Sequence, residues 1–69
     1  MLLVEDVGSR VRTIRRARAL TQRDLSDRSG IAVSTIVDIE RGKTEPQIRT
    51  LRRLAKALEV TPERLVLGD

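Results

Sequence analysis

The chain has 69 residues, a length that supports one small domain, residues 1–69, with a modest hydrophobic core. It contains no cysteine and no histidine, which excludes disulfides and most zinc sites, and no aromatic residue, which argues against the base-stacking surfaces of single-strand binders. Fourteen Lys and Arg against ten Asp and Glu give a net charge of +4, which favours a polyanionic partner, with a solvated basic surface as the alternative.

The pattern of apolar residues predicts an all-helical fold. Apolar positions recur at helical spacing throughout the chain, and no stretch alternates for long enough to predict a strand. The first helix is expected over about residues 6–19, with Val7, Val11 and Ile14 on one face. Its outer surface is expected to carry Arg10, Arg12, Arg16 and Arg18.

Two short helices follow, joined by a very short connection. The second is expected over residues 21–28, where Thr21 and Asp24 can form a capping box, somewhat weakened because Asp replaces the usual Glu or Gln. Gly30 supplies the left-handed conformation that ends this helix, and a side chain there is expected to clash with the steeply crossing third helix over residues 33–41. The residues expected to pack at the crossing are Leu25, Ile31, Ile36 and Ile39.

The rest of the chain predicts two further helices. The fourth follows Pro46 and is strongly amphipathic. Its apolar stripe comprises Ile48, Leu51, Leu54, Ala55 and Leu58. Its basic stripe comprises Arg49, Arg52, Arg53 and Lys56. The fifth begins at Thr61 with Pro62 in its first turn, which completes a compact five-helix, all-α domain.

The second and third helices form a unit that is typical of DNA-binding proteins. The outer face of the third helix is left free of the predicted core. This face carries Val33, Ser34, Val37 and Asp38. An exposed helix of this kind fits the major groove of DNA, which is about 12 Å wide.

Five short motifs carry a resemblance to a known family. They are Leu-Thr-Gln at 20–22, Ser-Thr-Ile at 34–36, Ile-Glu-Arg-Gly-Lys at 39–43, Pro46, and Leu-Ala-Lys-Ala-Leu at 54–58. In this order and spacing they resemble the Cro/repressor-type, lambda-repressor-like helix-turn-helix family, over about four-fifths of the chain. The resemblance implies a sequence-specific regulator of transcription, a repressor or autoregulator. It would bind double-stranded DNA as a homodimer and read the major groove with the helix at about 32–41.

The resemblance also assigns roles to individual positions. Base contacts are implied for Ala32, Val33, Ser34 and Asp38. Contacts to backbone phosphates are implied for Gln22, Thr35, Arg41, Lys43 and Thr44, with ordinary solvent-exposed polar residues as the alternative. An internal salt bridge between the first and third helices is implied for Arg15 and Glu40.

The predicted base-reading positions depart from the family pattern. Relatives often carry Gln, Arg, Asn or Lys there, whereas Ala32 and Val33 offer only apolar contact suited to a thymine methyl group. The Ser34 hydroxyl can form a hydrogen bond with any base and so does not distinguish between bases. Asp38 can accept a hydrogen bond from cytosine N4 but repels phosphates. Specificity would then come from thymine methyls, DNA shape and a second half-site, or this copy of the fold no longer recognises an operator.

Two other classes of function are alternatives to DNA binding. A protein-interaction module that keeps the fold, such as an antitoxin-like partner protein, is supported by acidic Asp38 beside an apolar surface of Ala32, Val33 and Val37. An enzyme is not expected, because no carboxylate pair is accompanied by a nucleophile–base set or a phosphate-binding glycine loop. The four glycines are interpreted as punctuation between helices, and no metal or cofactor is expected.

Both ends of the chain carry apolar residues beyond those needed for the predicted core. They are Met1, Leu2 and Leu3 at one end and Val60, Leu65, Val66 and Leu67 at the other. We expect the last helix and the loop before it to form a two-fold contact between copies, with packing on their own core as the alternative. The apolar runs are short, and the start of the chain is too short and acidic for a signal peptide, so a cytoplasmic protein without membrane segments is expected.

Overall fold

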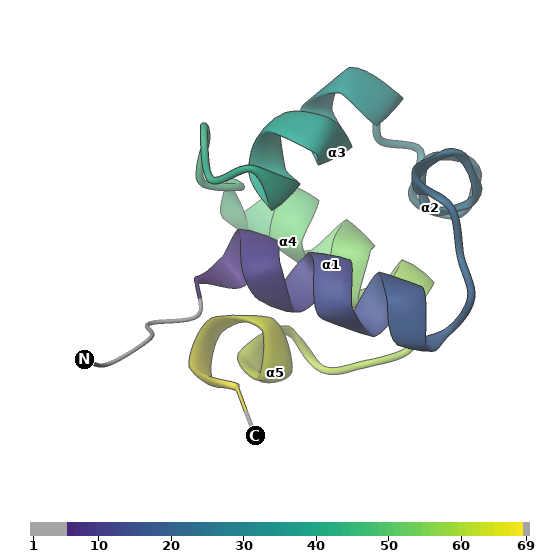
Figure 1. The fold of residues 1–69 in the computed structure, drawn as a ribbon. Coiled ribbons are helices and arrows are strands. Elements are labelled where there is room, and N and C mark those ends of the chain that lie inside the picture. Colours follow the sequence, from purple (N-terminus) through teal and green to yellow (C-terminus); the bar gives the residue numbers. More distant parts are fainter. Residues whose placement is uncertain (1–5, 69) are drawn as a thin grey trace.

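The structure is a computed structural model that describes residues 6–68. It contains the helices α1 (Val7–Ala17), α2 (Gln22–Ser29), α3 (Val33–Glu40), α4 (Ile48–Leu58) and α5 (Pro62–Leu67). Residues 6–68 form no strand, which confirms the all-helical prediction. Figure 1 shows α1 crossing in front of α4, with α2 and α3 above this pair and α5 below it. Within the described range, no helix is long and apolar enough to cross a membrane.

Local side-chain signals define where the helices begin. The Asp6 carboxylate accepts a hydrogen bond from the backbone N–H of Ser9 at 2.8 Å and caps α1. Thr21 and Asp24 form a complete capping box at α2, in which each side chain accepts from the backbone N–H of the other at 2.9 Å. Thr61 caps α5, with Pro62 as its first residue. These starts agree with the sequence pattern because capping depends only on residues within one turn.

The helix ends differ from the prediction by one or two residues. The first helix stops at Ala17 rather than at residue 19, because Ala19 adopts a left-handed conformation with φ 57°. The third stops at Glu40 rather than at residue 41. Gly30 is left-handed with φ 75° and ends α2 as predicted. Figure 1 shows α2 nearly end-on while α3 runs across the view, so the two helices cross steeply.

Two of the glycines play different parts from those predicted. An added Cβ at Gly30 would meet nothing within 4 Å, so glycine is favoured there by its positive φ and not by a clash. Gly8, interpreted as punctuation, instead lies inside α1 and is buried. A Cβ at Gly8 would overlap the carbonyl oxygen of Ile39 and lie 3.0 Å from its carbonyl carbon. Gly8 therefore permits a close approach between the backbones of α1 and α3.

The predicted apolar faces meet in one core. Its fully buried members are Val11, Leu25, Ile36, Leu54, Leu58 and Leu65, and the other buried apolar residues are Leu20, Ile31, Ile39, Leu51, Ala55 and Ala57. Ile48 was predicted in the apolar stripe of the fourth helix but is 57% exposed. As the first residue of α4, it precedes the turns that enter the core.

The end of α5 is fastened to α1 by an arginine. Arg10 was predicted on the outer surface, but its Nη1 donates hydrogen bonds to the carbonyl oxygens of Leu65 at 3.2 Å and Val66 at 2.7 Å. These carbonyls at the end of a helix have no partner within the helix, which is why an arginine is favourable there. Leu65 is buried in the chain's own core, whereas Val66 and Leu67 are exposed. The predictions for Met1, Leu2 and Leu3 lie outside the described residues.

The capping box makes stability depend on pH. The hydrogen bond from the backbone N–H of Thr21 lowers the pKa of Asp24, so this carboxylate stabilises the fold above the pKa that it has in the unfolded chain. That contribution is lost as the pH falls through the lower folded-state pKa. We expect wild type to melt above Asp24→Asn at pH 7, and the difference to shrink below about pH 4. Melting curves at several pH values check this, and a gap independent of pH would contradict it.

Candidate nucleic-acid interface

The residues predicted to contact bases lie on the free side of α3 and at its start. Ala32 occupies the N-cap position, makes no side-chain cap bond and is exposed. Ser34 is exposed in the first turn, while Val33 and Asp38 are half-buried. The opposite side of α3 is buried in the core, so the helix has one accessible side.

The residues predicted to contact phosphates flank this side of α3. Gln22 is the first residue of α2 and is half-buried, and Thr35 is exposed on α3. Arg41, Lys43 and Thr44 are exposed in the turn that follows α3. The structure therefore brings polar donors from α2, from α3 and from this turn to the neighbourhood of one helix.

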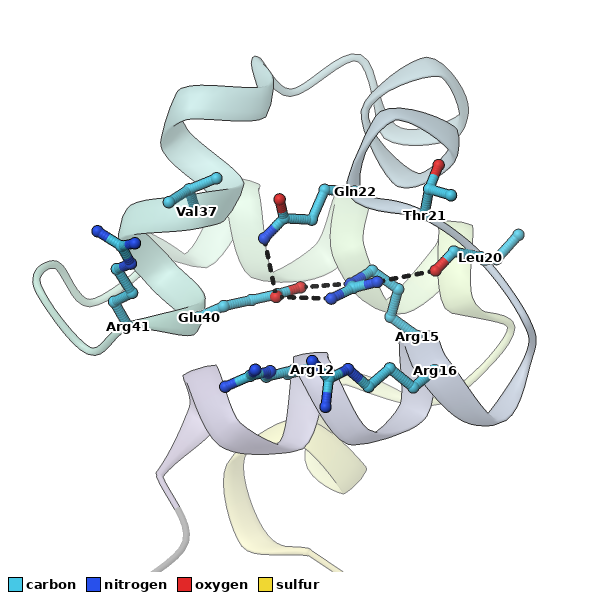
Figure 2. A pocket seen from close by; sticks show the side chains of 9 residues that line it. All are labelled: Arg12, Arg15, Arg16, Leu20, Thr21, Gln22, Val37, Glu40 and Arg41. Carbon is cyan, nitrogen blue, oxygen red and sulfur yellow. Dashed lines mark hydrogen bonds and ion pairs between the residues drawn. The ribbon is translucent and has the colours of Figure 1, made fainter.

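Beneath them lies a buried ion pair between α1 and α3 (Figure 2). Arg15 Nε donates to Glu40 Oε2 at 2.7 Å and Nη2 donates to Oε1 at 3.0 Å. The remaining Nη1 donates to the carbonyl oxygen of Leu20 at 2.8 Å. The hydrogen bond to Glu40 raises the pKa of Arg15 above its ordinary value. The pair joins α1, α3 and the segment before α2 in one bidentate arrangement.

Gln22 extends this network in a way that the sequence did not indicate. Its Nε2 donates to Glu40 Oε1 at 3.2 Å, so the amide is oriented by the ion pair. A glutamine amide has two N–H groups, and the second one remains available to a ligand. The family resemblance had implied the Arg15–Glu40 pair, which the structure contains, but Gln22 comes from a third helix and no local spacing could have linked it to them.

The network forms part of the lining of a concavity of about 520 Å³. Its lining comprises Arg12, Arg15, Arg16, Leu20, Thr21, Gln22, Val37, Glu40 and Arg41. Four of these residues are arginines and one is an acid, so the concavity is electropositive. Arg12 and Arg16 were interpreted only as outer surface. The signal available in the sequence was their spacing of four, which sets two residues on one side of a helix.

Known proteins share this arrangement of helices. The helix-turn-helix family profile matches residues 11–65. The immunity repressor protein of Bacillus phage phi105 is 37% identical over 60 residues, which cover 87% of this chain and 42% of that repressor. An uncharacterized HTH-type transcriptional regulator of Sinorhizobium fredii is 40% identical over 60 residues, which cover 87% of this chain and 78% of that regulator.

The solved structures include a similar protein bound to DNA. The P22 c2 repressor protein, in complex with synthetic operator 9T, has a TM-score of 0.88 and 33% sequence identity, and the match covers 96% of this chain and 100% of that chain. The chain thus spans all of that solved domain, but less than half of the phi105 repressor. These matches confirm the resemblance drawn from the five motifs. The chain belongs to the helix-turn-helix family, in which the phi105 and P22 proteins are repressors.

Proposed function

We propose that this protein binds double-stranded DNA at specific sequences, with α3 in the major groove, and regulates transcription as a repressor or autoregulator. The observation that carries the proposal is the free side of α3, flanked by donors from α2 and from the turn after α3. An exposed helix supplies readout of bases, and flanking donors fix its position on the backbone. The similarity to an operator-bound repressor supports the same conclusion.

Base readout is assigned to Ala32, Val33, Ser34 and Asp38. The exposed start of α3 is the part of a recognition helix that meets base edges in this class of proteins. Val33 offers a thymine methyl group an apolar contact, and the Asp38 carboxylate accepts from cytosine N4. These contacts are few, so much of the affinity must come from phosphates.

Phosphate contacts are assigned to Gln22, Thr35, Arg41, Lys43 and Thr44. The turn after α3 is held against that helix, because the backbone N–H of Lys43 donates to the carbonyl oxygen of Asp38 at 2.9 Å. A turn fixed in this way presents its donors with little loss of conformational entropy on binding. One N–H of the Gln22 amide donates to Glu40, so its second N–H can donate to a phosphate.

A homodimer on a symmetric site completes the proposal. Val66 and Leu67 are 45% and 75% exposed at the end of α5, and a contact between copies would remove this apolar surface from water. Figure 1 shows α5 below α1, on the side away from α3, so such a contact leaves α3 free. Two copies would then read half-sites about one helical turn apart.

Selection from a random pool of duplexes at about 150 mM salt tests the function. We expect an enriched palindrome whose half-sites are separated by about 34 Å along the helix axis. The variant Val33→Ala/Asp38→Ala should bind duplex DNA but lose preference within each half-site. The matched control Arg52→Gln/Arg53→Gln, on exposed positions of α4, should select the same palindrome as wild type.

Three other outcomes would contradict all or part of the proposal. Binding without an enriched sequence would mean that the apolar and acidic face of α3 does not read bases. Failure to bind any duplex would remove DNA as the partner and favour a protein-interaction module. An enriched sequence without symmetry would contradict the homodimer alone.

A further inference from the structure

The concavity beside α3 holds positive charge that no acidic side chain within residues 6–68 neutralises. On its floor Arg15 and Glu40 pair with each other, and both carboxylate oxygens already accept hydrogen bonds. In residues 6–68 no acidic side chain forms an ion pair with Arg12, Arg16 or Arg41. A ligand for this concavity must therefore be an anion that interacts with Arg12, Arg16 and Arg41 rather than with the Arg15–Glu40 pair.

We propose that Arg12 and Arg16 of α1, together with Arg41, bind a phosphate of the DNA backbone in this concavity. The inference rests on the proposed function and adds α1 to the DNA-binding surface. Neither α1 arginine is among the contacts that the family resemblance implies. Two guanidinium groups one helical turn apart, which line one concavity with a third, present several N–H donors to a phosphate, whose oxygens accept such bonds in pairs.

The position of the concavity favours the DNA backbone over a free anion. Val37 and Arg41, from α3 and the residue that follows it, line the same concavity as the α1 arginines. Figure 2 shows Arg41 on the side of α3, Arg12 and Arg16 on the side of α1, and Gln22 above the ion pair. A helix inserted in the major groove has a phosphate strand on each flank. An anion in this concavity lies on one flank of α3, where such a strand passes.

Another basic concavity provides a matched control. It measures about 590 Å³ and is lined by Arg28, Ser29, Arg53, Lys56, Ala57 and Glu59, with no residue of α3. Removing two charges there changes the net charge as much as removing two charges from α1. The pair to compare is therefore Arg12→Gln/Arg16→Gln and Arg53→Gln/Lys56→Gln. All four residues are exposed, and glutamine keeps the helix propensity, so both variants should melt close to wild type.

The dissociation constant for a duplex, measured against salt concentration, tests the inference. For Arg12→Gln/Arg16→Gln we expect roughly tenfold or greater weakening at about 150 mM salt, equal for selected and random duplexes, and a slope of log Kd against log salt smaller by about 1 to 2. The Arg53→Gln/Lys56→Gln control should keep the wild-type slope. Identical slopes for the two variants would overturn the inference and leave the proposed function intact, whereas a wild type that binds no duplex defeats both.

Neutral methylphosphonate substitutions, placed one at a time along the bound duplex, locate the contact. We expect one position, or two adjacent ones, where neutralisation weakens wild type but not Arg12→Gln/Arg16→Gln. Equal losses for both proteins at every position would overturn the assignment. Binding to polyglutamate is measured as well. If Arg12→Gln/Arg16→Gln loses this binding but keeps the wild-type slope of log Kd for DNA against log salt, the assignment is overturned, and the concavity is assigned to an acidic polypeptide.

Discussion

Gly8→Ala is expected to lower the melting temperature by about 8 °C or more. An added Cβ would overlap the Ile39 carbonyl oxygen, a backbone atom that cannot rotate away, so α1 must move from α3. Such overpacking costs about 1–3 kcal/mol and occasionally more, and backbone overlap belongs to the upper end. Alanine regains about 1 kcal/mol of helix propensity, which leaves a net loss of about 2 kcal/mol. In a domain of this size each kcal/mol shifts the melting temperature by about 4–8 °C.

Thr13→Ala is the control for the gain in propensity. Thr13 lies in the same helix, is exposed and gains helix propensity on substitution, so this variant should melt at or above wild type. A Gly8→Ala protein that melts as high as Thr13→Ala would contradict the close approach of α1 and α3. Thermal unfolding followed by circular dichroism is sufficient for the comparison.

Arg15→Ala is expected to be the most destabilising single truncation of a charged residue. It leaves the Glu40 carboxylate buried, with only Gln22 as a donor, and removes the donor to the Leu20 carbonyl. Loss of one partner of a buried pair costs about 3–5 kcal/mol, because the remaining charge is unpaired. A domain of this size has only about 3–10 kcal/mol of stability in total, so the variant should be largely unfolded or melt more than about 12 °C lower.

Two comparisons separate the ion pair from a general effect of charge. Arg12→Ala removes the same charge from an exposed position one turn away and should melt close to wild type. Arg15→Met/Glu40→Met removes both charges and should recover part of the loss, because no charge stays buried without a partner. Equal melting temperatures for Arg15→Ala and Arg12→Ala would contradict the structural role of the pair.

Glu40 contributes both to stability and to the proposed DNA binding. Its Oε1 accepts from both Arg15 and Gln22, so the ion pair that holds α1 against α3 also orients a proposed phosphate donor. Arg12 and Arg16 of α1, which form no ion pair among the described residues, line the same concavity as this pair. In the proposed complex, phosphate recognition on this flank of α3 would rest on a buried ion pair that is already hydrogen-bonded within the protein, which limits the entropy lost when DNA is bound.

Features that depend on a few neighbouring residues could be predicted from the sequence. The capping box of Thr21 and Asp24, the left-handed Gly30 and the Thr61–Pro62 start of α5 each involve residues within one turn. The periodic apolar residues determined the helices and almost all of the core, because burial of one face follows from periodicity. The helix-turn-helix family was also evident from sequence, because its motifs combine these local signals in a particular order and spacing.

Apart from the Arg15–Glu40 pair, which the family resemblance implied, only the tertiary structure decided how distant segments meet. Arg10 bonds to carbonyls 55 and 56 residues away, and Gln22 bonds to a carboxylate 18 residues away, at positions that look like ordinary surface. Gly8 resembled helix punctuation until the backbone of α3 was placed against it. Periodicity tells which side of a helix is buried, but not which helix lies there or how closely. Those distances depend on the joint packing of all the helices, and they determine which arginines line the concavity beside α3.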